Sequence, residues 1–117
     1  MKKIKLSIYE RLWFPSLSLQ NGDKKDMLAV RIIEDKYRIT PKEQEEIEFI
    51  QLPNGSMRWN GLKAKDKEFT FEDIEIMYIQ AGLAQADSQK RLSKDNLDLF
   101  LKLEKWASQT EEKLTKK

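Results

Sequence analysis

Cysteine and histidine are both absent from this chain of 117 residues. Without cysteine the chain cannot form a disulfide. Without either residue it also lacks the usual ligands of structural zinc sites and iron–sulfur clusters, a thiol nucleophile and an imidazole general base. The composition still permits metals bound by oxygen ligands and chemistry based on carboxylate, lysine or tyrosine side chains. The range of possible catalytic classes is therefore small.

Long apolar runs and glycine-rich motifs are also missing. The longest apolar stretches, such as residues 76–79, are much shorter than the ~20 residues that span a bilayer. Residues 4–8 alternate apolar with polar side chains and do not form the continuous apolar segment of a signal peptide. The 4 glycines are isolated, and none begins a phosphate-binding loop. We therefore expect a cytoplasmic protein with no membrane partner and no cofactor.

Charge is abundant but unevenly distributed. Charged residues make up 36% of the chain, and the formal net charge is only +2. Residues 1–42 carry +5, residues 43–75 carry −5 and residues 76–117 carry +2. A nucleic-acid-binding protein usually presents a dense basic surface, and here the basic segment is followed by an acidic segment of equal size. This pattern favours a protein partner, or a homo-oligomer that pairs basic with acidic surfaces, over a nucleic acid.

Hydrophobic periodicity and capping signals predict a single α+β domain over residues 1–109, followed by a polar, frayed tail at 110–117. We expect a small two- or three-stranded antiparallel sheet packed against about five helices. The predicted elements, in chain order, are a strand at 2–8, a short helix capped by Ser7 and ended by Pro15, a helix from Asp23 to about Tyr37, a short helix capped by Thr40, a hairpin at about 47–60, a strand at 67–71, a helix opened by Thr70, and a last helix capped by Ser93 that includes Trp106.

The most specific local signals lie in the middle of the chain. Thr40 is placed as an N-cap, Pro41 stands at the first helical position, and Glu43 completes a capping box. In the hairpin that follows, Asn54-Gly55 favours the positive backbone angles of a type I′ turn. The strand at 67–71 can join this hairpin as a third strand.

The helix opened by Thr70 is apolar on two sides. One stripe contains Ile74, Met77, Tyr78, Ala81 and Ala84, and a second contains Ile76, Ile79 and Leu83. We expect this helix to be central and buried over much of its circumference. Gly82 costs about 1 kcal/mol in a helix interior, so its presence indicates close packing or an early helix end.

Acidic side chains gather at two places in the sequence. They are Glu43, Glu45, Glu46 and Glu48 in the first group and Glu72, Asp73 and Glu75 in the second. A magnesium or calcium site built from both groups is one interpretation, but neither group has the Asp/Asn and glycine spacing of a calcium loop. Acidic residues in the first turn of a helix are stabilised by the helix dipole, which favours capping and solvation. We therefore predict no metal site, no catalytic constellation and no enzymatic activity.

Helices followed by a hairpin are also the order of elements in winged-helix DNA-binding domains. In that arrangement the helix after Thr40 would enter the major groove, and the hairpin would be the wing. That helix is acidic and would be repelled by phosphates. The nucleic-acid alternative therefore depends on the basic N-terminal segment, through Lys2, Lys3, Lys5, Lys24 and Lys25.

Aromatic residues provide the candidates for binding a protein. Trp13 and Phe14 are adjacent and precede Pro15, so their two rings cannot easily face one core. Trp59 lies on the hairpin between Arg58 and Asn60, and Trp and Arg are enriched among residues that dominate interface energies. For each tryptophan, burial in the core remains the other interpretation, because aromatic burial dominates core energetics. The candidate partner-binding residues are Trp13, Phe14, Arg58, Trp59 and Asn60.

Four segments give the chain a family resemblance: residues 4–12, residues 40–46, the hairpin end at residues 58–60 and residues 92–100. Through these segments the chain resembles small uncharacterised proteins encoded by bacteriophages and prophages. The resemblance implies an accessory protein that binds a host, defence or assembly protein in the host cell cytoplasm. It implies no catalytic residue.

Overall fold

A computed structural model describes residues 1–109 of the chain. Its elements, in chain order, are β1 (Lys2–Leu6), α1 (Ile8–Trp13), the 3-10 helix η1 (Phe14–Leu17), α2 (Lys24–Tyr37), α3 (Pro41–Glu46), β2 (Ile50–Gln51), β3 (Met57–Arg58), β4 (Lys67–Phe71), α4 (Asp73–Ser88) and α5 (Leu97–Ser108). The predicted α+β class is confirmed. The tail predicted at 110–117 lies outside the described residues.

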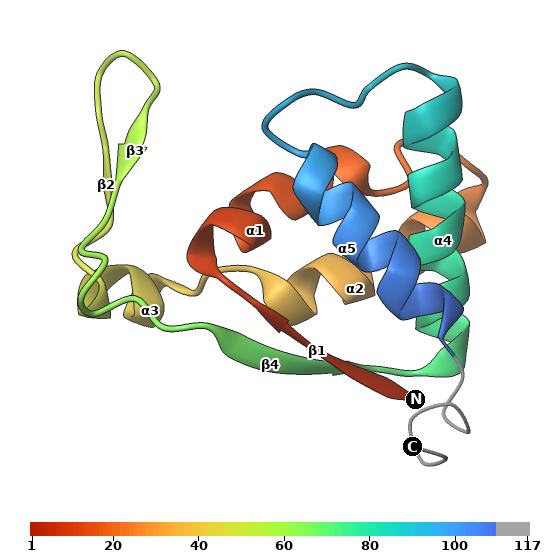
Figure 1. The fold of residues 1–117 in the computed structure, drawn as a ribbon, viewed down its shortest axis with the longest axis horizontal. Coiled ribbons are helices and arrows are strands. Elements are labelled where there is room, and N and C mark those ends of the chain that lie inside the picture. The colour runs from red at the N-terminus through yellow and green to blue at the C-terminus, as the bar shows by residue number, and fades with distance from the viewer. Residues whose placement is uncertain (110–117) are drawn as a thin grey trace.

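Strands β1 and β4 form an antiparallel ribbon along one side of the molecule, beneath the helices (Figure 1). Ile4 pairs with Phe69 in the register, and side chains two positions apart on a strand share a face. Ile4, Leu6, Phe69 and Phe71 therefore point the same way, and all four are buried. The ribbon supplies one wall of the main core.

The expectation that residues 67–71 extend the hairpin is wrong. Strand β4 pairs with β1, and β2 pairs with β3, so the described residues form two separate two-stranded sheets. Phe69 and Phe71 find apolar partners on the inner face of β1, whereas both residues of β2 and both residues of β3 are exposed. The burial of these two phenylalanines explains why β4 pairs with the N-terminal strand.

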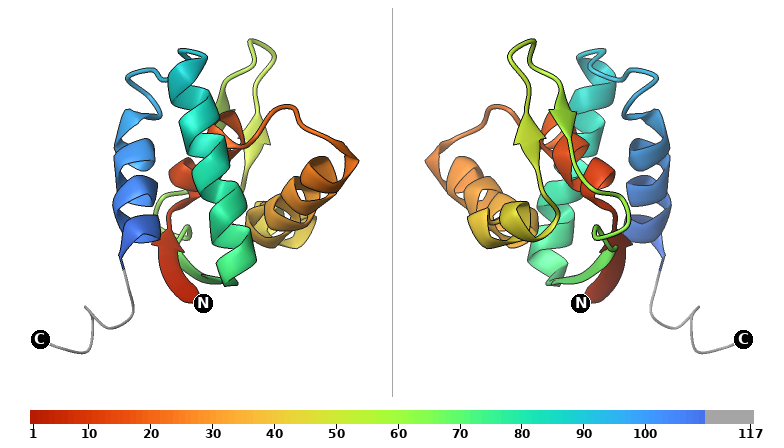
Figure 2. Two further views of the ribbon diagram at one scale, coloured as in Figure 1. Left: turned by 90° about the vertical axis from the view of Figure 1, so that its right-hand side faces the viewer. Right: turned by 90° about the vertical axis from the view of Figure 1, so that its left-hand side faces the viewer.

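Helix α4 lies between α2 and α5, and the three helices form one side of the molecule (Figure 2). The main core fills the space between these helices, η1 and the β1–β4 ribbon, and Tyr37, Phe14, Phe71 and Leu103 are among its most deeply buried members. Trp106, which the sequence places on the last helix, packs into this core from α5, and its Nε1 donates to the carbonyl oxygen of Lys3 at 2.8 Å.

The buried side of α4 is the second of the two predicted apolar stripes. Ile76, Ile79 and Leu83 face the core together with Gly82 and Ala86. The first stripe faces outward, which corrects the expectation that the helix is buried over much of its circumference: Ile74 is 57% and Met77 is 61% exposed. Gly82 and Ala86 are small, and their side of the helix can approach η1 most closely.

Three helix caps confirm the sequence signals, and two differ. Ser7, Asp23 and Thr40 each accept a hydrogen bond from the backbone N–H three residues later. At the other two helices the N-cap positions are Glu72 for α4 and Asn96 for α5. Thr70 is held in β4 by pairing with β1, and a turn between Ser93 and Asn96 delays the start of α5.

The hairpin turn is not of type I′. The Gly55 φ is 90°, but Asn54 is not left-handed. The carbonyl of Leu52 accepts the N–H of Gly55 at 2.9 Å, and the N–H of Leu52 donates to the carbonyl of Ser56 at 2.7 Å. Pro53 explains the difference, because its ring fixes a negative φ and favours a type I turn followed by a left-handed glycine.

Candidate protein-binding site

Arg11 organises the polar contacts beside the hairpin although it is only 3% exposed. Its Nε donates to the Tyr37 carbonyl at 2.8 Å, Nη2 donates to the Arg38 carbonyl at 3.0 Å, and both terminal nitrogens donate to the Glu43 carboxylate at 2.8 Å. The guanidinium also lies 5.1 Å from the centre of the Phe69 ring. These contacts join α1 to the end of α2, to α3 and to β4.

The ionisable groups around Arg11 have strongly shifted pKa values. The hydrogen bonds from Arg11 lower the pKa of Glu43 from 4.5 to about 2 and keep its carboxylate ionised at neutral pH. Burial raises the pKa of Tyr37 well above its ordinary value, and the ring stacks on Phe14 with centroids 4.1 Å apart. Neither group is suited to exchanging a proton near neutral pH.

A second, smaller hydrophobic cluster lies where α3 leads into the hairpin. Its buried members are Ile8, Ile39 and Ile47, and Leu12, Phe49, Trp59 and Ala64 pack against them. The Phe49 and Trp59 rings stack across the hairpin base, with centroids 6.2 Å apart and planes 8° apart. Glu48 reverses the chain between α3 and β2 with a φ of 58°, and the N–H of Phe49 donates to the Gln44 carbonyl at 2.8 Å. The stacked rings therefore anchor the hairpin to the body.

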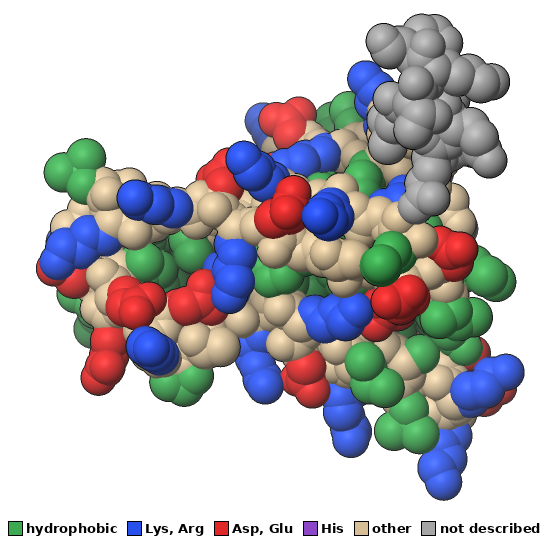
Figure 3. All heavy atoms as spheres, turned by 90° about the horizontal axis from the view of Figure 1, so that it is seen from below, with side chains coloured by type: hydrophobic (Ala, Val, Ile, Leu, Met, Phe, Trp, Pro, Cys, Tyr) green, Lys and Arg blue, Asp and Glu red, His purple; other side chains and the backbone are tan. Residues whose placement is uncertain are grey.

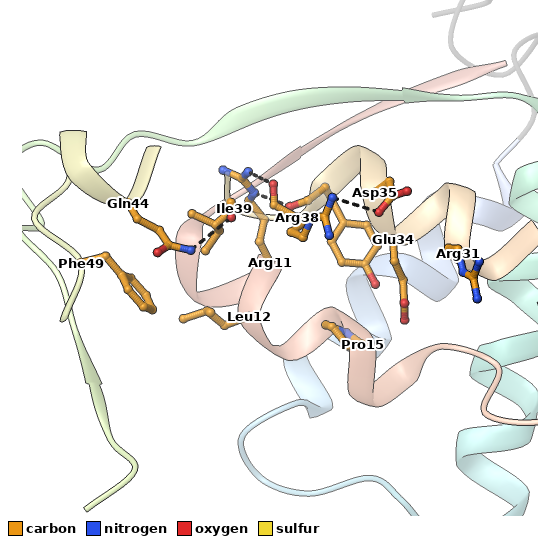
Figure 4. Close-up of a pocket in the computed structure, with 11 residues that line it drawn as sticks. Arg11, Leu12, Pro15, Arg31, Glu34, Asp35, Arg38, Ile39, Gln44 and Phe49 are labelled. Carbon is orange, nitrogen blue, oxygen red and sulfur yellow. Dashed lines mark hydrogen bonds and ion pairs between the residues drawn. The ribbon is translucent and has the colours of Figure 1, made fainter. Parts of the chain in front are cut away.

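A cleft of about 700 Å³ opens between α1, α2 and the hairpin base (Figure 4). The apolar part of its lining is Leu12, Pro15, Ile39 and Phe49. The charged part is Arg11, Arg31, Glu34, Asp35 and Arg38. Phe49 lies near one end of the cleft and Arg31 near the other, and an ion pair of 3.2 Å joins Arg38 to Asp35 between them (Figure 4). The cleft thus combines apolar surface with exposed charges of both signs.

Beyond the cleft, the hairpin projects away from the helices (Figure 1). Ile50 is 51% and Met57 is 44% exposed on its two strands, and Leu62, in the loop that follows, is 93% exposed. Strands β2 and β3 pair only with each other, so each has an outer edge without a backbone partner among the described residues. An arm with open edges and exposed apolar side chains is suited to contact with another protein.

The structure separates the residues that the sequence proposes for partner binding. Phe14 is 2% exposed and belongs to the main core, so its ring is not accessible to a partner. Trp13 is half-buried and lines a different hollow, on the α5 side of α1. Arg58, Trp59 and Asn60 remain together at the hairpin, where Arg58 is exposed and the other two are half-buried. Of the five predicted residues, Arg58, Trp59 and Asn60 are therefore the ones that lie at the hairpin, beside the cleft.

Sequence reasoning missed Arg11, Phe49, Ile50 and Met57 as residues of this site. No local signal distinguishes Arg11, because an arginine on a short amphipathic helix is usually exposed. A signal did exist for the hairpin: Phe49 and Ile50 place apolar side chains on both faces of one strand. A single core cannot bury both faces of a two-stranded hairpin.

The lysines of the nucleic-acid alternative have different environments. Lys2 Nζ donates to the carbonyl oxygens at the end of α5, at 2.9 and 3.1 Å, so it is engaged within the fold. Lys3 and Lys5 are exposed on β1, and Lys24 and Lys25 are exposed at the start of α2. On the face that shows the ribbon from below, Lys and Arg side chains alternate with Asp and Glu (Figure 3). That face carries no continuous basic stripe.

Several acidic side chains highlighted by the sequence have partners within the chain. Glu48 accepts from Lys63 at 2.8 Å and from Asn60 at 3.2 Å, contacts that lower its pKa. Glu75 accepts from Lys36 at 2.6 Å. Within residues 1–109, no group of three or more Asp or Glu side chains is placed to hold a metal ion.

Comparisons with protein-family models, with curated proteins and with solved structures found no match. Across the described helices, none has the length and apolar character required to cross a membrane.

Proposed function

We propose that this chain is a non-enzymatic protein-binding domain whose hairpin docks on a partner protein while the cleft at its base receives a segment of that partner. The observation that carries the proposal is the projecting hairpin with exposed Ile50 and Met57. An isolated two-stranded hairpin is marginally stable in water, and apolar side chains on it gain little from the domain's own core. Their burial against a partner would supply that missing stabilisation.

The chemistry of the cleft supports a polypeptide ligand. Its apolar residues can accept an apolar side chain, and the charges around them have both signs. Mixed charges suit a protein surface, whereas a nucleic acid calls for a predominantly basic one. The donors of Arg11 are used within the fold, so Arg31 and Arg38 are the cations exposed to a ligand.

The state of the ionisable groups supports the non-enzymatic part of the proposal. Glu43 is held ionised by Arg11, and burial raises the pKa of Tyr37. Glu48 is stabilised as a carboxylate by Lys63. These shifts follow from structural contacts and move each pKa away from neutrality, where general acid–base catalysis would need it.

The resemblance to phage and prophage proteins suggests the class of partner. We extend the proposal to an accessory protein of a phage or mobile element that acts in the host cytoplasm. Its partner would be a host, defence or assembly protein.

The test compares a hairpin variant with a matched variant on α5. Ile50→Asp combined with Met57→Asp places two charges on the arm, and Leu101→Asp places one on a side chain that is 50% exposed and lies on α5. After affinity capture has identified a partner, the Kd of the purified partner is measured for wild type and both variants. We expect the hairpin variant to bind about 30-fold more weakly or worse, as for hot-spot residues, and the α5 variant to bind like wild type.

Equal circular dichroism spectra would establish that all three proteins are folded. A hairpin variant that binds as tightly as wild type would contradict the proposal. The nucleic-acid alternative would be favoured instead by a salt-sensitive shift in the electrophoretic mobility of DNA or RNA at about 50 mM salt. Alanine substitutions at Lys3, Lys5, Lys24 and Lys25 should then abolish that shift.

A further inference from the structure

Asparagine precedes glycine at three places in the chain: Asn21-Gly22, Asn54-Gly55 and Asn60-Gly61. In such a pair the glycine nitrogen can attack the side-chain amide carbon of the asparagine, because glycine has no Cβ to obstruct the approach. The asparagine then loses its amide without an enzyme. The motif is the same at all three places, and the structure distinguishes them.

The first difference is the state of the glycine nitrogen. Attack is disfavoured where the glycine N–H is held in a hydrogen bond, because the nitrogen must approach the amide carbon and lose its proton. The N–H of Gly55 donates to the Leu52 carbonyl at 2.9 Å inside the hairpin turn. Among the described residues, the N–H groups of Gly22 and Gly61 have no hydrogen-bond partner. The Gly55 nitrogen is therefore held, and the other two are available.

The second difference is the freedom of the asparagine side chain. Asn60 is half-buried and is held at both ends of its amide: Oδ1 accepts the N–H of Leu62 at 2.9 Å, and Nδ2 donates to Glu48 at 3.2 Å. Asn21 is exposed, and its side chain has one hydrogen bond within residues 1–109, from Gln85 Nε2 to Oδ1 at 2.9 Å. Only Asn21 therefore combines an available glycine nitrogen with an amide that is held at one end.

The contacts of Gln85 fix which end of the Asn21 amide is free. Gln85 Oε1 accepts the N–H of Gln20 at 2.7 Å and Nη2 of Arg91 at 3.2 Å, so Nε2 is the end that faces Asn21. Nε2 is a donor, and the atom it meets is the acceptor Oδ1. A donor on this oxygen stabilises the negative charge that develops there during attack, and it leaves Nδ2 unbonded.

We propose that Asn21 is the site at which the folded chain modifies itself by losing a side-chain amide. The Gly22 nitrogen bonds to Asn21 Cγ, the Cγ–Nδ2 bond breaks, and the amide leaves as ammonia with the proton from the glycine nitrogen. Water then opens the resulting cyclic imide at one of its two carbonyl carbons. Opening at Cγ gives aspartate, and opening at the backbone carbonyl gives isoaspartate. The reaction consumes only water.

Packing at the start of α2 favours glycine at position 22. A Cβ there would lie 2.7 Å from Asp26 Oδ2 and 2.9 Å from Asp26 Cβ. The Asp26 side chain is fixed in the capping box of α2, where Oδ2 accepts the N–H of Asp23 at 3.2 Å. A larger residue at position 22 would slow the attack but would also disturb this cap. The labile pair is therefore a consequence of how the chain enters α2.

The modification would change the loop between η1 and α2, which lies at the edge of the molecule (Figure 2). Either product places a carboxylate near Asp23 and Asp26 and lowers the formal net charge from +2 to +1. Isoaspartate also lengthens the main chain next to the Gln20 N–H that bonds Gln85. This loop and the hairpin stand at opposite ends of the molecule (Figure 1), so the inference does not depend on the proposed hairpin function.

The test follows the three asparagines in one protein sample. Purified wild type is kept at mildly alkaline pH, either folded in buffer or unfolded in guanidinium chloride, and samples are digested with trypsin at intervals. Cleavage after Lys24 and Arg58 places the three asparagines in separate peptides. Mass spectrometry then measures the loss of each amide, and fragmentation separates isoaspartate from aspartate. Asn21→Ser is the control, and it should accumulate less of the more acidic species on ion exchange than wild type does.

In guanidinium chloride the contacts that distinguish the sites are lost, and we expect similar rates at all three. In the folded protein, Asn21 should react at least about tenfold faster than Asn54 and Asn60, because those two require local opening before attack. Loss of the Asn54 or Asn60 amide as fast as that of Asn21 in the folded protein would overturn the proposal. Protection of Asn21 by folding to the same extent as the other two would also overturn it.

Discussion

At the scale of single residues, Gly82 decides how closely α4 can pack. A Cβ at this position would lie 2.7 Å from the Leu19 nitrogen and 2.8 Å from the Leu17 carbonyl oxygen. Both are backbone atoms, so a side-chain rotation cannot relieve the contact. The sequence indicates either close packing or an early helix end at Gly82, and close packing is the interpretation confirmed, because α4 continues to Ser88.

Gly82→Ala is therefore expected to destabilise the fold even though alanine is the better helix former. The gain in helix propensity is about 1 kcal/mol, and the forced separation of α4 from η1 costs more than that gain. We expect a net loss of about 2 kcal/mol in the free energy of unfolding, measured with urea. Gly61→Ala is the control, since no atom lies within 4 Å of its Cβ position, and it should change stability by less than about 0.5 kcal/mol. Equal stabilities would contradict the close approach.

At the scale of elements, one partly buried ion pair joins three helices. Arg11 on α1 bonds the last carbonyls of α2 and the carboxylate of Glu43 in the first turn of α3. Glu43 also accepts the backbone N–H of Thr40 at 3.1 Å, so the capping box and the ion pair share one carboxylate. The capping signal in the sequence thus marks a residue that also holds α1 in place.

Glu43→Gln retains a capping side chain but removes the charge. Because the folded pKa of about 2 lies below the ordinary 4.5, the ionised carboxylate stabilises the fold above about pH 5, and this contribution is lost as pH falls from 4.5 towards 2. We expect the substitution to lower the free energy of unfolding at pH 7 by about 1–3 kcal/mol, and to flatten its decline between pH 5 and pH 2.5. Urea unfolding across that range checks both effects. Glu46→Gln, on the exposed side of α3, should match wild type throughout.

At the scale of the whole molecule, the hydrophobic residues form two clusters of unequal size. The main core draws on β1, η1, α2, β4, α4 and α5, whereas the cluster at the hairpin base has three buried members. Few apolar contacts oppose the opening of a small cluster, so a region of this kind opens locally more easily than the main core. The hairpin and α4 should therefore differ in stability within one folded molecule.

Native-state hydrogen exchange measures this difference. Amides of residues 50–58 are expected to exchange through local opening, at free energies well below those of residues 79–83, which should approach the global value. Binding of a partner to the hairpin should raise the protection of residues 50–58 selectively. Protection of the free hairpin equal to that of α4 would show that the two clusters unfold as one unit.

Sequence reasoning succeeded where the relevant residues are close in the chain. Ser7, Asp23 and Thr40 were identified as caps because each bonds a backbone group three residues later. The hairpin position was also found, but its turn type was wrong, since the effect of Pro53 outweighed the preference of Asn-Gly. At the candidate site, Arg58, Trp59 and Asn60 were predicted, while the contribution of Arg11 depends on α2 and α3 packing around it.

The sequence alone determined the α+β class and most of the helix starts, because these depend on residues a few positions apart. Its composition alone excluded chemistry that requires cysteine or histidine. The pairing of β4 with β1, the buried stripe of α4 and the burial of Phe14 depended on packing between distant segments. Two apolar stripes on one helix look equivalent in sequence, and the stripe that carries Gly82 and Ala86 became the buried one because only that side can approach η1 closely. The same choice left Ile74 and Met77 exposed on the surface.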